Sequence, residues 1–69
     1  MIKFTAKENE LLQYLVKGMN NKDIAEKMFT TTHTVKAHIT SIMKKLNVTN
    51  RTAVVYEAIK NKIVDINND

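Results

Sequence analysis

The feature that most constrains the fold is an apolar stripe in the middle of the chain. Four aliphatic residues recur there at intervals of four, three and four positions: Val35, Ile39, Ile42 and Leu46. Residues three and four positions apart lie on the same face of an α-helix, so this spacing predicts an amphipathic helix over about residues 32–46. The chain contains no Pro and a single Gly, which disfavours tight hairpins and points to helices elsewhere as well.

A capping box predicts the first helix. Thr5 and Glu8 are three residues apart, the spacing at which each side chain accepts a hydrogen bond from the other's backbone N–H. Apolar residues then recur at helical spacing, and Gly18 follows them, where a left-handed residue ends a helix most easily. We therefore expect a first helix over about residues 6–17, with an inner face formed by Leu11, Leu12, Leu15 and Val16.

Two shorter helices complete the predicted fold. Asn20 is a suitable N-cap for a second helix over about residues 21–29. A fourth helix is expected over about residues 51–61, with Val55 and Ile59 on its inner face. The apolar residues that follow it are expected to pack back on the core: Ile63, Val64 and Ile66.

The order of these helices predicts a known motif. A short second helix, a turn over residues 29–31 and a longer helix capped by Thr31 have helix-turn-helix geometry. The turn lacks the glycine that such turns often contain. The expected fold class is therefore all-α, a single four-helix domain over residues 1–69 with the helix-turn-helix motif over about residues 21–40.

Composition argues against several function classes. The chain has no Cys for a disulfide or a thiolate metal site, and its 69 residues leave little room for a catalytic cleft. His33 and His38 are five positions apart, ~140° around a helix, so they do not converge on one metal ion. No apolar run approaches the ~20 residues of a membrane span, and no signal peptide opens the chain. We expect a cytoplasmic protein that is not an enzyme, carries no cofactor and does not enter a membrane.

The distribution of charge suggests a polyanionic partner. The formal net charge is +4, but residues 27–56 contain no Asp or Glu at all. Five cations lie in this acid-free window: Lys27, Lys36, Lys44, Lys45 and Arg51. Such a one-sided distribution is typical of a surface that binds nucleic acid, although a merely solubilising surface is the alternative.

The outer face of the third helix sharpens this expectation. Opposite the stripe lie His33, Ala37, Thr40 and Lys44, flanked by Lys36 on one side and by Thr34 and Ser41 on the other. Small and basic side chains without carboxylates suit a helix that enters a DNA major groove. We expect Lys36 and Thr40 to reach base edges, Ala37 to contact a thymine methyl group and His33 to point towards the groove. The residues expected to contact phosphates are Lys22, Lys44, Lys45 and Arg51.

Several motifs together identify a family resemblance. They are Thr-x-x-Glu at residues 5–8, Gly18, Asn-Lys-Asp-Ile-Ala at 21–25, Thr-Val-Lys at 34–36 with His38, Lys-Leu at 45–46 with Val48, and Arg-Thr at 51–52. In this order and spacing the chain resembles, over residues 4 to about 64, the LuxR/FixJ/GerE-type DNA-binding domain of bacterial transcription regulators.

This resemblance implies specific roles. In the family the third helix reads the major groove of double-stranded DNA, and the fourth helix forms a dimer on two-fold-related half-sites. Carried over by position, base contacts fall on Lys36, Ala37 and Thr40, and phosphate contacts fall near Asn21, Lys22, Thr34 and Lys44. The sequence departs from the family pattern at Thr30, where an aliphatic residue is usual, at Ala53, where a polar residue is common, and at Lys62, where Gly is frequent.

The fourth helix also carries a dimer prediction from its own residues. With Val55 and Ile59 inward, Val54 and Ala58 extend apolar surface to one side, beside Glu57 and Asn61. A second apolar side indicates a weak homodimer through these four residues, unless Val54 only covers the edge of the core. The alternative function is a helical protein-interaction module that binds an acidic partner or RNA polymerase.

Overall fold

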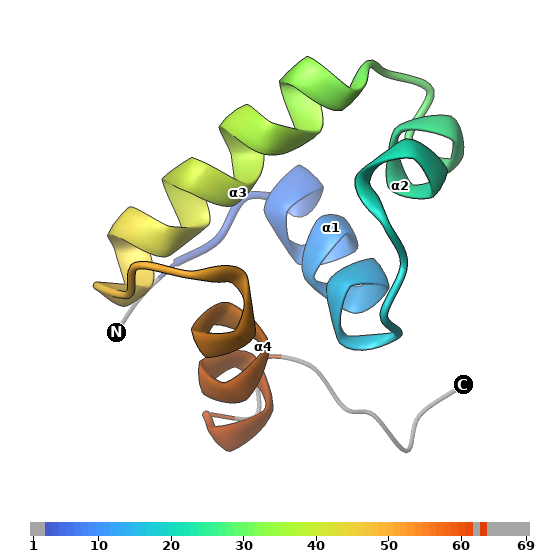
Figure 1. The fold of residues 1–69 in the computed structure, drawn as a ribbon. Helices are drawn as coiled ribbons and strands as arrows, with labels where there is room; N and C mark the ends of the chain where they lie inside the picture. The colour runs from blue at the N-terminus through green and yellow to red at the C-terminus, as the bar shows by residue number, and fades with distance from the viewer. Residues whose placement is uncertain (1–2, 62, 64–69) are drawn as a thin grey trace.

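Four helices form the part of the chain that the structure describes. The computed structural model describes residues 3–61 and 63, and these residues contain no β-strand. The helices are α1 (Ala6–Val16), α2 (Asn21–Lys27), α3 (Thr32–Leu46) and α4 (Arg51–Lys60) (Figure 1). The predicted all-α class is confirmed, and only the C-terminal ends of α1, α2 and α4 differ, by one or two residues.

Each helix begins at the side chain that caps it. Thr5 and Glu8 form the expected capping box on α1, with N···O distances of 2.9 and 3.1 Å. The side chains of Asn20, Thr31 and Asn50 accept backbone N–H groups at the starts of α2, α3 and α4. A cap of this kind stabilises a helix by about 1 kcal/mol, so the four caps together fix where the helices of this small domain begin.

Three residues with positive φ follow the C-terminal ends of α1, α2 and α3. The free energy of adopting this left-handed conformation differs between them. Gly18 follows α1 with φ of 80°, and Asn47 ends α3 with φ of 56°. Gly and Asn adopt this left-handed region readily. Phe29, the first residue of the turn between α2 and α3, has φ of 55° although left-handed backbone costs such a residue about 1–2 kcal/mol. The turn that lacks glycine is therefore made by an aromatic residue, and its side chain is 96% exposed.

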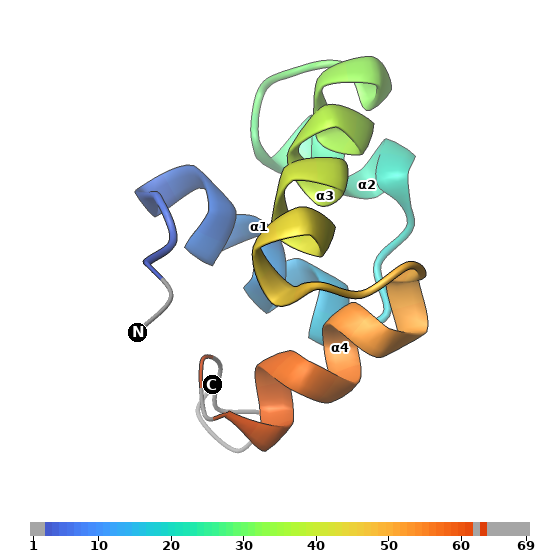
Figure 2. The same ribbon diagram turned by 90° about the vertical axis from the view of Figure 1, so that its left-hand side faces the viewer.

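The core lies where α1 meets α3 and α4. Helix α3 packs on α1, α2 and α4, and α4 packs on α1 as well (Figures 1 and 2). The predicted stripe of α3 faces inward, because Val35, Ile39 and Ile42 are buried and Leu46 is half-buried. The other fully buried large side chains are Leu11, Leu12, Ile24 and Val54.

The predicted orientation of α4 is wrong. Val54 and Ala58 are fully buried in the core, whereas Val55 is half-buried and Ile59 is 38% exposed. Both pairs have the spacing i,i+4, and a rotation of the helix by ~100° exchanges their positions. Apolar character alone therefore does not determine which pair is buried. In the observed rotation Arg51 lies on the same face as Val54 and Ala58, and its guanidinium bonds to Asn21 at the start of α2 and to Met19 just before it.

Of the apolar residues that follow α4, Ile63 lies within the described part of the chain. Ile63 packs against the core as expected, while Lys62, Val64 and Ile66 lie outside the described residues. No helix in the described segment is long and apolar enough to cross a bilayer. Among the same residues no three His, Cys, Asp or Glu side chains gather as they would around a metal ion.

Candidate nucleic-acid interface

The outward face of α3 is the candidate interface. It presents five side chains that are all exposed: His33, Lys36, Ala37, Thr40 and Lys44. They lie opposite the buried stripe, as the helical period requires. The chain has no acidic residue from Lys27 to Tyr56, so α3 carries no carboxylate that would repel a polyanion.

Local hydrogen bonds determine which hydroxyl groups of α3 remain available as hydrogen-bond donors or acceptors. The Thr40 hydroxyl donates to the backbone carbonyl of Lys36 at 3.0 Å, so its oxygen remains as an acceptor on the outer face. At the start of the helix the Thr31 hydroxyl donates to Oγ1 of Thr34 at 3.1 Å. The Thr34 hydroxyl therefore keeps its own hydrogen available as a donor.

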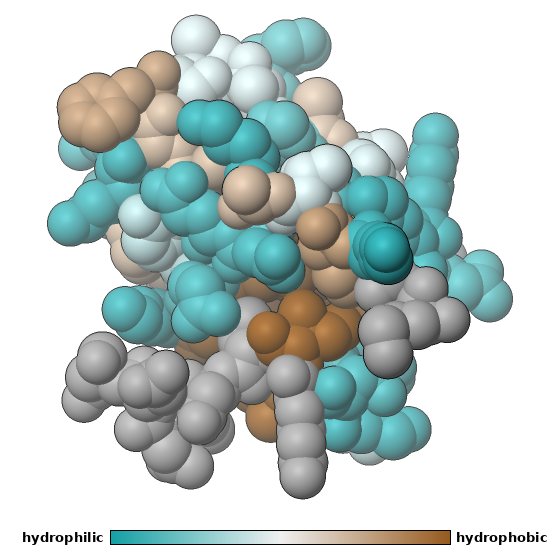
Figure 3. All heavy atoms as spheres, turned by 180° about the vertical axis from the view of Figure 1, so that it is seen from behind, coloured by the Kyte–Doolittle hydropathy of each residue, from teal (hydrophilic) through white to brown (hydrophobic). Residues whose placement is uncertain are grey.

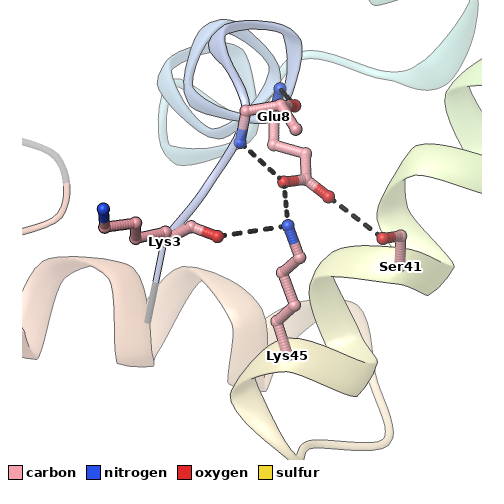
Figure 4. A network of polar contacts seen from close by, with 5 residues as sticks. Lys3, Glu8, Ser41 and Lys45 are labelled. Atoms are coloured by element: carbon pink, nitrogen blue, oxygen red, sulfur yellow. Dashed lines mark hydrogen bonds and ion pairs between the residues drawn. The ribbon is translucent and has the colours of Figure 1, made fainter. Parts of the chain in front are cut away.

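Lys45 lies differently from its neighbour Lys44. Its Nζ forms an ion pair with Oε1 of Glu8 at 2.6 Å and donates to the backbone carbonyl of Lys3 at 3.2 Å (Figure 4). It also lies 5.6 Å from the centre of the Phe4 ring. Lys45 was expected at a phosphate, but the structure engages it within the domain, between the start of α1 and the last turn of α3.

The environment of Glu8 stabilises its ionised form and therefore its ion pair with Lys45. Its side chain is almost fully buried and also accepts hydrogen bonds from the Ser41 hydroxyl and the Thr5 backbone N–H. Burial by itself raises the pKa of Glu8, but these hydrogen bonds, that of Lys45 and the lysine charge outweigh it and lower the pKa from 4.5 to about 2. Glu8 is therefore an ionised anchor for α3. Its capping-box spacing revealed the helix start but gave no sign of a partner 37 residues away.

Arg51 is also engaged inside the domain. Its guanidinium donates to the side-chain oxygen of Asn21 and to the backbone carbonyl of Met19. The first residue of α4 is thus joined to the first residue of α2. Arg51 was expected at a phosphate, but it holds Asn21, another expected phosphate contact, in place. Lys22, the next residue of α2, is exposed.

The residues expected at a dimer interface divide into two sets. Val54 and Ala58 lie in the core and are unable to contact a partner, which corrects that prediction. Glu57 and Asn61 lie at the surface, where the Asn61 side chain donates to the carboxylate and the carbonyl of Glu57. The exposed apolar side chains of α4 are Tyr56 (61% exposed) and Ile59, and the sequence pattern did not predict this pair because it placed Ile59 on the inner face.

These features define a class of protein. A short helix, a turn and a longer helix with an exposed, acid-free outer face are those of a helix-turn-helix DNA-binding domain. The family model "Bacterial regulatory proteins, luxR family" matches residues 3–58. The chain belongs to this family and is a LuxR-type DNA-binding domain of transcription regulation. The family consists of regulators and is not a class of enzymes.

Relatives and solved structures agree with the family. The chain is 48% identical over 61 residues to "Uncharacterized transcriptional regulatory protein YxjL" of Bacillus subtilis, and 46% identical over 59 residues to "Oxygen regulatory protein NreC" of Staphylococcus carnosus. These matches cover 88% and 86% of this chain but only 28% and 27% of the relatives.

Among solved structures, transcription factor GerE matches with a TM-score of 0.84 and 29% identity, over 90% of this chain and 92% of that one. The response regulator ChrA of a heme-sensing two-component system matches with a TM-score of 0.86 and 39% identity, over 90% of this chain and 31% of ChrA. The chain therefore spans less than a third of the length of YxjL, NreC and ChrA.

Proposed function

We propose that residues 1–69 act as one domain that binds double-stranded DNA sequence-specifically, with α3 in the major groove. The observation that carries this proposal is the outer face of α3, where five exposed side chains are small, neutral or basic. A B-DNA major groove is about 12 Å wide and admits one helix, and small side chains let the helix backbone approach the bases.

The exposed side chains differ in what they offer to bases. Lys36 suits the acceptors of guanine, and Ala37 suits the methyl group of thymine. The Thr40 oxygen, whose hydrogen is bonded within the helix, suits the amino group of adenine or cytosine. His33 stands one turn before Lys36 and Ala37 on the same face and reaches the groove from the start of α3.

Contacts to the DNA backbone would set the position of α3. We assign them to side chains near the starts of α2 and α3 and near the end of α3: Asn21, Lys22, Thr34 and Lys44. The Thr34 hydroxyl is free to donate to a phosphate oxygen, and the exposed amino groups of Lys22 and Lys44 neutralise charge. We assign no phosphate contact to Lys45 or Arg51. Glu8 holds Lys45, and Asn21 and Met19 hold Arg51.

Dimerisation through α4 is the second part of the proposal. The supporting observation is the exposure of Tyr56 and Ile59 on the side of α4 that faces away from the core. Two copies related by a two-fold axis would bury these side chains against each other, with Glu57 and Asn61 at the edge. Such a dimer would read two half-sites in inverted orientation.

In vitro selection from a random pool of DNA duplexes tests both parts. The expected result is an enriched site with two inverted half-sites, bound about 10³-fold or more tightly than scrambled duplex. Enrichment of a single half-site would contradict the proposed dimer but would still support the reading of DNA by α3. No enrichment at all would favour the alternative of a helical module that binds an acidic protein.

A further inference from the structure

The partners of the Arg51 guanidinium are both neutral. It donates to Oδ1 of Asn21 and to the backbone carbonyl of Met19, and its side chain is half-buried. Within the described residues the one ion pair is that of Lys45 with Glu8, so no close carboxylate cancels the charge of Arg51. Arginine is more often paired with a carboxylate or a phosphate, so its hold on an amide points to a role for that amide.

The contact with Arg51 determines which way the amide of Asn21 faces. A guanidinium only donates hydrogen bonds, so it takes the amide oxygen and leaves Nδ2 on the other side. Nδ2 makes no hydrogen bond to another group in the described part of the chain. No buried side-chain nitrogen or oxygen there lacks a partner, so Nδ2 is open to solvent. Asn21 therefore presents a hydrogen-bond donor at the surface, and its acceptor is turned inward.

The start of α2 is a suitable place for a donor that meets DNA. In a helix-turn-helix the first helix crosses the DNA backbone, and exposed Lys22 follows Asn21 directly. Hydrophilic side chains make up most of the face on the α2 side in Figure 3. Phosphate oxygens only accept hydrogen bonds, so Nδ2 suits them and Oδ1 would be repelled. The orientation of this one amide therefore decides whether Asn21 favours or opposes binding.

We propose that Arg51 is a positioning residue for DNA binding. By holding Oδ1 it turns Nδ2 of Asn21 towards a phosphate, and it does not contact the DNA itself. Its second hydrogen bond, to Met19, fixes the guanidinium, so the amide is oriented before the DNA arrives. The charge of Arg51 also polarises the amide and strengthens its donation. This role rests on the proposed function, in which Asn21 faces the DNA backbone.

The first test changes only the outward end of the amide. Asn21→Asp keeps an oxygen for Arg51 and replaces Nδ2 by a second oxygen, so urea denaturation should show a stability at least equal to that of the parent. We expect its affinity for the selected duplex to fall about tenfold or more, as for the loss of a hydrogen bond to a charged group. Asn9→Asp, on an exposed residue of α1, adds the same charge outside the helix-turn-helix and should have a much smaller effect. Equal affinities of these two variants would overturn the proposal.

The second test is a double-mutant cycle on the same duplex. Arg51→Met and Asn21→Ala should each weaken binding about five- to tenfold, and the double variant should bind no more weakly than either, because Arg51 acts through Asn21. Losses that multiply would overturn the proposal, since a structural role of Arg51 would persist without the amide. Circular dichroism verifies that the variants are folded. Arg51→Lys, which keeps the charge and loses the planar fork, replaces Arg51→Met in the cycle if that variant is unfolded.

The dependence of binding on salt separates positioning from direct contact. A phosphate contact by Arg51 itself would make Arg51→Met lower the slope of log affinity against log salt by about 1. Positioning of a neutral amide leaves that slope unchanged, and a lowered slope would overturn the proposal. If the parent binds no duplex, the proposed function fails and the role of Arg51 with it. Multiplying losses or a lowered slope would remove only the role of Arg51.

Discussion

Helices α3 and α4 both place apolar residues at intervals of three and four, yet only α3 reveals its buried face in the sequence. In α3 the positions opposite Val35 and Ile39 are polar, small or charged, so one orientation alone keeps the apolar groups from water. In α4 the pairs Val54/Ala58 and Val55/Ile59 compete, and a contact outside the helix decides between them. A helix that is apolar on two sides buries one of them in the core and leaves the other exposed for a partner. The sequence of the helix alone does not determine which side is buried.

The largest expected effect separates the two apolar pairs of α4. Val54→Asp buries a charge without a partner, and we expect a loss of about 3–5 kcal/mol in the free energy of unfolding, measured by urea denaturation. Native domains have about 5–15 kcal/mol of stability in total, so this loss removes a large part of it. The same substitution at half-buried Val55 is the matched control and should cost clearly less. A larger effect at Val55 would mean that α4 is rotated as the sequence first suggested.

The next effect concerns the outer face of α3. Lys36→Ala should cost about 1–3 kcal/mol in DNA binding and relax the preference at one base pair, since Lys36 is assigned to a base edge. Lys44→Ala should weaken binding to all duplexes alike and lower the slope of log affinity against log salt by about 1. Titrations of both variants on the selected site and on scrambled duplex measure these quantities. If Lys36→Ala leaves affinity and preference unchanged, α3 does not enter the groove on this face.

A smaller effect distinguishes Lys45 from Lys44. Lys45→Met should lower the free energy of unfolding by about 1–2 kcal/mol, less than for a fully buried pair because Lys45 is 33% exposed. Lys44→Ala should leave stability almost unchanged. The double variant Glu8→Gln/Lys45→Met should recover part of the loss, because it leaves no unpaired buried carboxylate. Additive losses in this double-mutant cycle would show that the pair does not couple.

The same pair predicts a dependence on pH. The pKa of Glu8 is about 2 in the folded protein against 4.5 for the free side chain, so the unfolded state binds a proton first as the pH falls. The stability that ionised Glu8 provides is complete above pH 4.5 and is lost as the pH falls towards about 2. Urea denaturation across this range should show a smaller decline for Glu8→Gln than for the parent. Equal declines would assign the acid sensitivity to other carboxylates.

The smallest expected effect on stability lies on the exposed side of α4. Ile59→Ser should lower the free energy of unfolding by about 1 kcal/mol, because Ile59 is 38% exposed and lies outside the buried core. It should nevertheless reduce cooperative binding to two half-sites, measured by band shift on one and two half-sites. Unchanged cooperativity would leave α4 without its proposed role in the dimer.

The sequence predicted the parts of this fold that are local. Capping side chains and the positions of Gly18 and Asn20 act within a few residues, so the four helices and the stripe of α3 were predicted almost to the residue. The rotation of α4 and the partners of Lys45 and Arg51 depend on groups 30 or more residues away along the chain, which no local pattern in the sequence reveals. The left-handed conformation of Phe29 was missed because residue preferences predict Gly or Asn there.

Arg51 connects the starts of α4 and α2. Helix α4 packs on α1 and α3, and α2 packs on α3, and the guanidinium adds a direct link from the start of α4 to the start of α2. One of its hydrogen bonds goes to Asn21, the first residue of α2, and the other goes to Met19, which precedes α2. If a partner bound at α4 displaced Arg51, it would change the free energy of any contact that Asn21 makes, and by thermodynamic reciprocity a contact of Asn21 would change the affinity for that partner by the same amount.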